Sequence, residues 1–142
     1  MSGVSRDDPT VGAVIVTYHP DLQVLGRSLL ALVPQTHQIV VVDNGSACEL
    51  LSALGVIRQH SDITLIANAA NTGIAAAQNQ GVAYARARGC SHVIFFDQDS
   101  VPSPGLVSGL LDAAASAPGR SVDEDVVVGP CISDDRLGVR MP

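Results

Sequence analysis

The sequence predicts an α/β protein with a mostly parallel sheet and helices on both faces. Segments rich in Val, Ile and Leu alternate with segments whose apolar residues repeat at helical spacing. The extended segments are apolar almost without interruption, which is typical of parallel strands buried on both faces. With 142 residues, 46% of them hydrophobic, the chain has the size and composition of one folded domain.

The elements follow one another in a regular order, and turn residues or proline separate them. We expect a flexible lead-in over residues 1–10 and a single domain over residues 11–142. The expected strands are VGAVIVTY (11–18), QIVVVDNGS with its turn (38–46), DITLIAN (62–68), HVIFFD (92–97) and DVVVGPCI (125–132). The expected helices cover 21–33, 47–59 and 71–89, and a last one has Ser103 as N-cap and Pro104 as its first residue.

Composition excludes several classes of partner. The net charge is −6, the eight basic residues are scattered, and aromatic residues make up only 3%. Binding to nucleic acid, or to an anionic membrane by charge alone, is therefore not expected. The start of the chain lacks a signal peptide pattern, and no apolar run approaches the roughly 18 residues of a membrane span. Cys48, Cys90 and Cys131 have no C-x-x-C spacing, so we expect reduced, buried thiols and a cytoplasmic protein.

Polar residues follow the predicted strands, where a parallel sheet binds its ligands. The residues at these strand ends are Thr17, Tyr18, Asp43, Asn44, Gly45, Ser46, Asn68, Asp97, Gln98 and Asp99. Asp97 and Asp99 lie two residues apart, so in an extended chain their side chains would leave the same face. Two neighbouring carboxylates favour a hard divalent cation, Mg²⁺ or Mn²⁺, although one of them could instead cap a helix while the other is solvated. The position after a buried strand favours the metal site.

The other candidates have a structural and a functional interpretation each. Asp43 and Asn44 either form a turn or bind a nucleobase or ribose at the sheet edge. Thr17 and Tyr18 either end their strand or line the same pocket. The last three candidates are caps and polar helix positions, or else they mark a helix N-terminus that faces a diphosphate: Asn71, Gly73 and Asn79. The chain lacks the G-x-x-x-x-G-K-[ST] and G-x-G-x-x-G phosphate-binding patterns.

Four motifs, in this order and spacing, resemble the family 2 glycosyltransferases of the GT-A fold: VGAVIVTYHPD, IVVVDNGS, NTGIAAAQNQGVAYA and VIFFDQDSVPS. Within that family they look most like bacterial rhamnosyltransferases. The resemblance covers roughly residues 11 to 132. It implies a donor site for a nucleotide-diphosphate sugar, either dTDP-rhamnose or a UDP-sugar, and a glycan or lipid-linked acceptor.

The resemblance also implies roles for single residues. Thr17 and Tyr18 would line the base pocket, and Asp43 with Asn44 would recognise the base. Asp97 would contact the ribose or the metal shell, and Asp99 would bind the metal on the diphosphate. Asn71, Gly73 and Asn79 match the family's helix motif beside the donor.

Family members are usually longer, and their second half supplies the acceptor pocket and the catalytic base. No catalytic residue is therefore assigned in this chain, and we expect it to be the donor-binding part of a longer protein. The resemblance places such a protein in polysaccharide assembly at the inner face of the cell membrane. Peripheral membrane association and homo-oligomer formation stay open.

Two other functions compete with transfer. One is a nucleotide-sugar-binding module without catalysis, or an inactive fragment that acts with a partner chain. The other is a receiver-like or flavodoxin-like module, which the complete absence of lysine disfavours.

Overall fold

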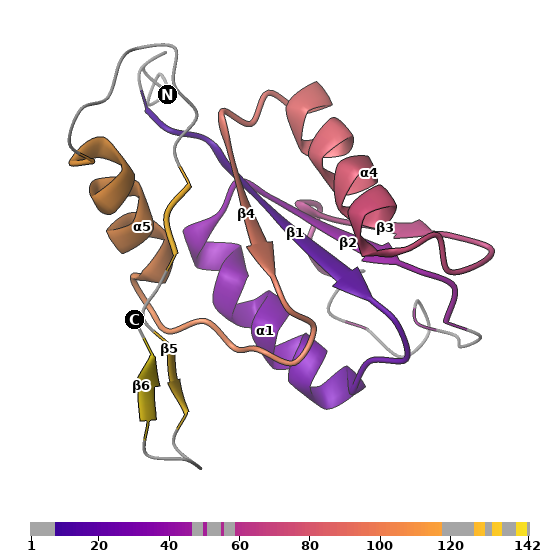
Figure 1. Cartoon of the computed structure of the whole chain (residues 1–142). Coiled ribbons are helices and arrows are strands. Elements are labelled where there is room, and N and C mark those ends of the chain that lie inside the picture. The colour runs from indigo at the N-terminus through magenta and orange to yellow at the C-terminus, as the bar shows by residue number, and fades with distance from the viewer. Residues whose placement is uncertain are drawn as a thin grey trace. The chain divides into compact units, whose positions relative to one another are not determined.

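The computed structural model describes residues 8–46, 50, 55, 59–117, 127–129, 132–134 and 139–141. The chain divides into two compact units, Met1–Pro104 and Gly105–Pro142. The first unit holds a four-stranded parallel sheet with the order β3-β2-β1-β4 (Figure 1). Its strands are β1 (Val11–Thr17), β2 (Gln38–Asp43), β3 (Ile63–Ala67) and β4 (His92–Phe96), and its helices include α1 (Leu22–Leu32), η1 (Val33–Gln35) and α4 (Ile74–Ala87).

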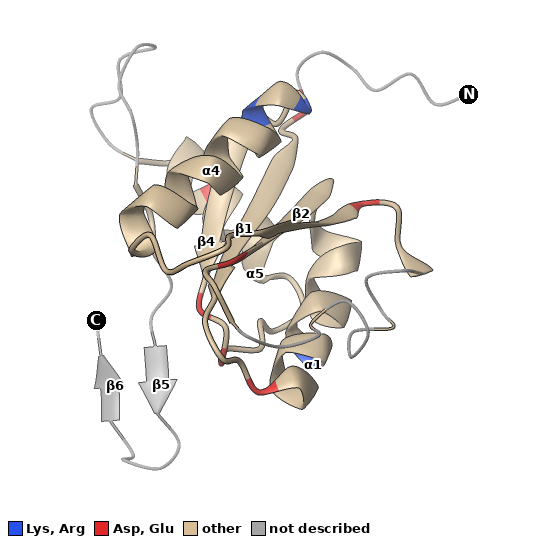
Figure 2. Ribbon diagram, turned by 90° about the vertical axis from the view of Figure 1, so that its right-hand side faces the viewer, with Lys and Arg blue, Asp and Glu red and all other residues tan. Residues whose placement is uncertain are grey.

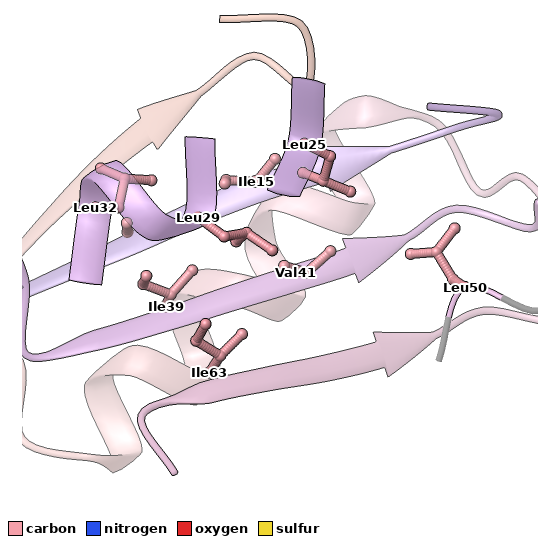
Figure 3. Packing of buried hydrophobic residues seen from close by; sticks show 9 residues of the cluster. Ile15, Leu25, Leu29, Leu32, Ile39, Val41, Leu50 and Ile63 are labelled. Carbon is pink, nitrogen blue, oxygen red and sulfur yellow. The ribbon is translucent and has the colours of Figure 1, made fainter. Parts of the chain in front are cut away.

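Both faces of this sheet are covered, which confirms the predicted fold class. On one face α1 packs its leucines against alternate residues of β1, β2 and β3 (Figure 3). On the other face Ala77 of α4 packs with Val40 and Val42. Because strand side chains alternate between faces, both sets of residues in an uninterrupted apolar strand are buried. The cluster on the α1 side consists of Ala13, Ile15, Leu25, Leu29, Leu32, Ile39, Val41, Leu50 and Ile63.

Polar contacts fix the ends of both helices. The carboxylate of Asp21 caps α1 by accepting hydrogen bonds from the backbone N–H groups of Gln23 and Val24 at 2.9 and 3.1 Å. Near the end of α4, the Tyr84 hydroxyl lies 3.0 Å from Thr64 Oγ1 of β3 and accepts a hydrogen bond from Arg88. The hydrogen bond with Thr64, followed by those with Arg88, lowers the pKa of Tyr84.

The second unit contains α5 (Leu106–Ala115) and an antiparallel pair, β5 (Ile132–Asp134) with β6 (Val139–Met141). The prediction that Ser103 caps α5 is wrong, because the helix is capped by Gly105 with φ 79° and ψ 3°. These angles match the third residue of a type II turn, which Pro104-Gly105 favours over a helix start. Of the strand expected over 125–132, residues 127–129 are not part of a strand, Ile132 opens β5, and the remainder lies outside the described residues.

The helix expected over 47–59 and two of the cysteines lie largely or wholly outside the described residues. Leu50, Gly55 and Gln59 of that segment are helical, and Leu50 is buried. Cys90 is partly buried, and this burial raises the pKa of its thiol. Cys48 and Cys131 are not described. In the described part of the chain, no helix is long and apolar enough to cross a membrane.

Candidate functional site

The carboxyl ends of the strands lie at one edge of the sheet. Thr17 is level with Asp43, and Asp43 is level with Ala67, so β1, β2 and β3 end together. The sheet order also places β1 between β2 and β4, and successive crossovers therefore change direction at β1. Such a topological switch point is where open parallel sheets bind ligands. The candidate residues that follow the strands in the sequence were predicted to lie at this edge.

A cleft of about 500 Å³ opens at this edge. Side chains from the end of β1, the turn after β2, the segment before α4 and the turn after β4 surround it. The lining residues are Val16, Tyr18, Asn44, Asn71, Ile74, Asp97, Gln98 and Asp99. The structure therefore brings together Tyr18, Asn44, Asn71, Asp97 and Asp99 of the candidates predicted from sequence.

Asp43 is occupied by hydrogen bonds within the protein. Its Oδ1 accepts from Thr17 Oγ1 at 2.8 Å and from Ser46 Oγ at 2.6 Å, and its Oδ2 accepts from the Ser46 backbone N–H at 2.9 Å. Thr17 is fully buried and Asp43 is 4% exposed, and neither lines the cleft. These contacts support the interpretation of Asp43 as the residue that holds the turn. A role in base recognition stays a prediction, which would use the remaining acceptor capacity of Oδ2.

Asn44 connects this turn to the segment before α4. Its Oδ1 accepts hydrogen bonds from the backbone N–H and the hydroxyl of Thr72, both at 3.0 Å, and from Asn68 Nδ2 at 3.3 Å. Its Nδ2 donates to Asn71 Oδ1 at 2.9 Å. Asn44 is 3% exposed, so its amide belongs mainly to this network while its edge reaches the cleft. Asn71, by contrast, is exposed.

The start of α4 is shaped by Gly73, whose φ of 85° suits glycine. Its backbone N–H donates to Asn71 Oδ1 at 2.9 Å, which explains Gly73 as a turn and cap position. Asn79 lies on an exposed part of α4 and does not line the cleft. Their predicted contacts with a donor stay predictions.

Asp97 and Asp99 belong to a turn, so the geometry of an extended chain does not apply to them. The backbone N–H of Ser100 donates to the carbonyl of Asp97 at 3.3 Å and closes this turn. The reason is that pairing of β4 with β1 ends at Phe96, opposite Ile15, so nothing keeps the following residues extended. Both carboxylates nevertheless lie in the cleft and are exposed.

The charge of the cleft is negative. Its lining contains two carboxylates and, among the described residues, no lysine or arginine. Arg86 and Arg88 lie at the C-terminal end of α4, away from its start at the cleft (Figure 2). The neighbouring Gly89 carbonyl accepts a hydrogen bond from the hydroxyl of Thr10, just before β1. An anionic ligand would therefore bind in the cleft only together with a cation that offsets the repulsion by the carboxylates.

The side chains that line the cleft provide only part of a binding site for a hard divalent cation. Within the described ranges, no group of three or more His, Cys, Asp or Glu side chains could hold a metal by itself. Mg²⁺ and similar ions, however, usually keep several waters and bind through one or two carboxylates plus the phosphates of a substrate. Asp97 and Asp99 fit that arrangement, in which the ligand completes the metal site.

Two lining residues, Val16 and Ile74, were missed by the sequence analysis. Val16 belongs to the strand pattern, and Ile74 is a first helical residue that is 63% exposed. Gln98 was expected at this edge, as the polar residue between the two acids, but the sequence analysis gave it no role. Its side chain is hydrogen-bonded to the backbone of Tyr18.

The fold and the cleft together define an α/β protein with a negatively charged cleft at the carboxyl edge of its parallel sheet, where such sheets bind their ligands. The family model of glycosyl transferase family 2 matches residues 13–131, and the chain belongs to this family. Over 88 residues it is 43% identical to dTDP-rhamnosyl transferase RfbF of Shigella flexneri, a match that covers 62% of this chain and 29% of the relative.

Two solved structures share the fold. A mannosyltransferase from Pyrobaculum calidifontis, PcManGT, solved in complex with GDP-Man and Mn²⁺, superposes with a TM-score of 0.61 and 21% identity, over 78% of this chain and 33% of that one. TarS (1–349) of S. aureus superposes with a TM-score of 0.56 and 18% identity, over 81% and 38%. These similarities confirm the GT-A type of fold. The chain spans less than two fifths of each of these proteins.

Proposed function

We propose that this chain is the donor-binding part of a metal-dependent, inverting glycosyltransferase. The donor would be a nucleotide-diphosphate sugar, with dTDP-rhamnose the first candidate because of the similarity to a dTDP-rhamnosyl transferase. The acceptor would be a glycan or a lipid-linked glycan, and the proposed setting is the cytoplasmic face of the membrane. The observation that carries the proposal is a cleft at the switch point that contains two carboxylates and no basic side chain among the described residues.

The lack of basic side chains decides how a diphosphate could bind there. Two carboxylates repel a diphosphate, and at about 4 Å each unit pair costs about 4 kcal/mol at an effective dielectric constant of 20. A divalent cation between carboxylates and diphosphate turns both repulsions into attractions. Binding of the nucleotide is therefore expected to require the metal.

Each wall of the cleft has a proposed task. Asp99, with Asp97, would hold Mg²⁺ or Mn²⁺, and Asp97 could also accept a hydrogen bond from the ribose. When bound, the metal supplies a positive charge that stabilises the departing diphosphate. Tyr18 also lines the cleft, is 48% exposed and has its ring centroid 4.3 Å from that of His19, so its ring would offer a partly apolar face to a base. Asn44 and Asn71 would border the same pocket.

Inverting transfer also requires a base that deprotonates the acceptor hydroxyl as the diphosphate leaves. We assign no residue of this chain to that step. The proposal therefore separates donor binding, for which this chain offers the residues, from turnover, which would use the part of the longer relatives that this chain does not span.

Isothermal titration calorimetry with dTDP and with UDP, each with and without Mn²⁺, tests the proposal. We expect at least one nucleotide to bind when Mn²⁺ is present, and we expect EDTA to abolish that binding. Asp99→Ala should lose the metal-dependent binding, because one carboxylate then remains. The preferred nucleotide would identify the base.

Asp62→Ala is the matched control. Asp62 is an exposed carboxylate that precedes β3, at the opposite edge of the sheet from the cleft. Asp62→Ala removes the same charge and side chain as Asp99→Ala, and this variant should bind the nucleotides as the wild type does. Absence of binding to either nucleotide by folded wild-type protein would contradict the proposal, as would equal binding with and without metal.

The alternative function is a nucleotide-sugar-binding module without catalysis. It makes the same binding predictions, since it uses the same cleft. Incubation of this chain with a labelled nucleotide-diphosphate sugar and a range of acceptors separates the two. Transfer of the labelled sugar would exclude a purely binding function.

A further inference from the structure

Gln98 lies between the two acids of the cleft, and its side chain pairs with the backbone of Tyr18. The Tyr18 N–H donates to Gln98 Oε1 at 2.8 Å, and Gln98 Nε2 donates to the Tyr18 carbonyl at 3.3 Å. One side-chain amide thus satisfies both backbone groups of one residue. Gln98 is half-buried, and its edge also lines the cleft.

This pairing occurs where the sheet stops. The pairing of β1 with β4 ends at Ile15 opposite Phe96, so backbone hydrogen bonds no longer join these two segments beyond that point. Tyr18 and the turn at Asp97–Ser100 would then be free to separate. The amide of Gln98 replaces the missing ladder with side-chain hydrogen bonds.

We propose that Gln98 is a positioning residue, which ties the acidic turn to the end of β1 and so keeps Tyr18 and the two carboxylates in one cleft. The inference rests on the proposed function and extends it, because it links the side of the cleft that would hold the base to the side that would hold the metal. Gln98 itself would touch neither the diphosphate nor the metal.

The chemistry of the side chain limits which residues can perform this task. Methionine has nearly the same length but neither hydrogen-bonding group, so Gln98→Met should break both contacts. Glutamate keeps an acceptor for the Tyr18 N–H and loses the donor to the Tyr18 carbonyl, so Gln98→Glu should keep the shorter contact. Gln23→Met is the matched control, because Gln23 is an exposed glutamine on α1.

Hydrogen exchange of the Tyr18 amide, followed by NMR, tests the contact without any ligand. We expect exchange about three- to tenfold faster in Gln98→Met, as for the loss of one neutral hydrogen bond. Gln98→Glu keeps the acceptor but places a carboxylate oxygen against the Tyr18 carbonyl, so its exchange should lie between those of the wild type and Gln98→Met. Gln23→Met should exchange as slowly as the wild type. Unchanged exchange of the Val14 amide in the middle of β1 would show that Gln98→Met is folded. Equal exchange of the Tyr18 amide in Gln98→Met and wild type would overturn the inference.

Titration with dTDP or UDP in the presence of Mn²⁺ tests the consequence. We expect Gln98→Met to bind about three- to tenfold more weakly and Gln23→Met to bind like the wild type. Faster exchange with unchanged affinity would overturn the positioning role. Wild-type protein that binds neither nucleotide would instead refute the proposed function, and with it the role of Gln98 in donor binding.

Discussion

At the scale of single residues, Asn44 carries the densest set of contacts at the cleft. Three donors converge on its Oδ1, and its Nδ2 reaches Asn71. A second amide pair, between Asn68 and Gln80, extends the network to α4 with hydrogen bonds of 2.8 and 3.1 Å. Because Asn44 is buried, loss of its side chain would leave donors without partners, which costs more than an exposed hydrogen bond.

Asn44→Ala is therefore expected to lower the free energy of unfolding by about 1–3 kcal/mol, since the Thr72 N–H would lose its acceptor. Urea denaturation, followed by circular dichroism, measures this change. Asn79→Ala is the control for stability, because Asn79 is exposed on α4 and should change the same quantity by less than about 0.5 kcal/mol. Equal loss of stability in both variants would contradict the role given to Asn44.

At the scale of elements, the position of α4 depends on a close approach to β1. Gly81 of α4 is buried against Val14, and a Cβ added at Gly81 would collide with Cγ1 of Val14. The absence of a side chain lets the helix lie close to the sheet. Because the first residues of α4 border the cleft, this packing also fixes one side of the site.

Gly81→Ala is expected to destabilise the protein by about 1–3 kcal/mol, because overpacking outweighs the roughly 1 kcal/mol by which alanine favours a helix. Gly26→Ala measures the helix preference of alanine without the overpacking. Gly26 lies inside α1, where an added Cβ would meet no atom within 4 Å, so alanine should stabilise by about 0.4–1 kcal/mol. Urea denaturation should show changes of opposite sign in the free energy of unfolding of the two variants. A stabilised Gly81→Ala protein would show that α4 can move away at little cost.

At the scale of the whole molecule, ligand binding should appear as added stability. A ligand that binds only the folded chain stabilises it by about 2.7 kcal/mol at one hundred times its Kd. If the metal bridges the carboxylates and the diphosphate, neither component alone can complete the site. Mn²⁺ and dTDP together should then raise the melting temperature by more than the sum of their separate effects.

Differential scanning calorimetry with Mn²⁺, with dTDP and with both measures this coupling. Asp99→Ala should show no joint effect, whereas Asp62→Ala should behave as the wild type. A joint effect that persists in Asp99→Ala would place the metal elsewhere in the protein.

Much of the fold follows from local pattern. The uninterrupted apolar strands predicted a parallel sheet covered on both faces, because strand side chains alternate and both sets are apolar. The local prediction failed for Ser103, where Pro104 and Gly105 favour a turn before α5. The strand expected over 92–97 also ends one residue early, at Phe96, and the acid pair belongs to the turn that follows. In both places the chain leaves regular structure, and short-range preferences compete closely.

The sequence by itself determined the fold class, the edge of the sheet that carries the polar residues, and the family resemblance, since these depend on periodicity and on motifs in order. Only the tertiary structure decided which candidates share the cleft. It buries Thr17 and Asp43 in hydrogen bonds, leaves Asn79 on the outside of α4, and shows Gln98 hydrogen-bonded to the backbone of Tyr18. The reason is physical: sequence places a residue at an edge, but strand register and side-chain hydrogen bonds between distant segments decide whether it points into the cleft or holds its wall in place.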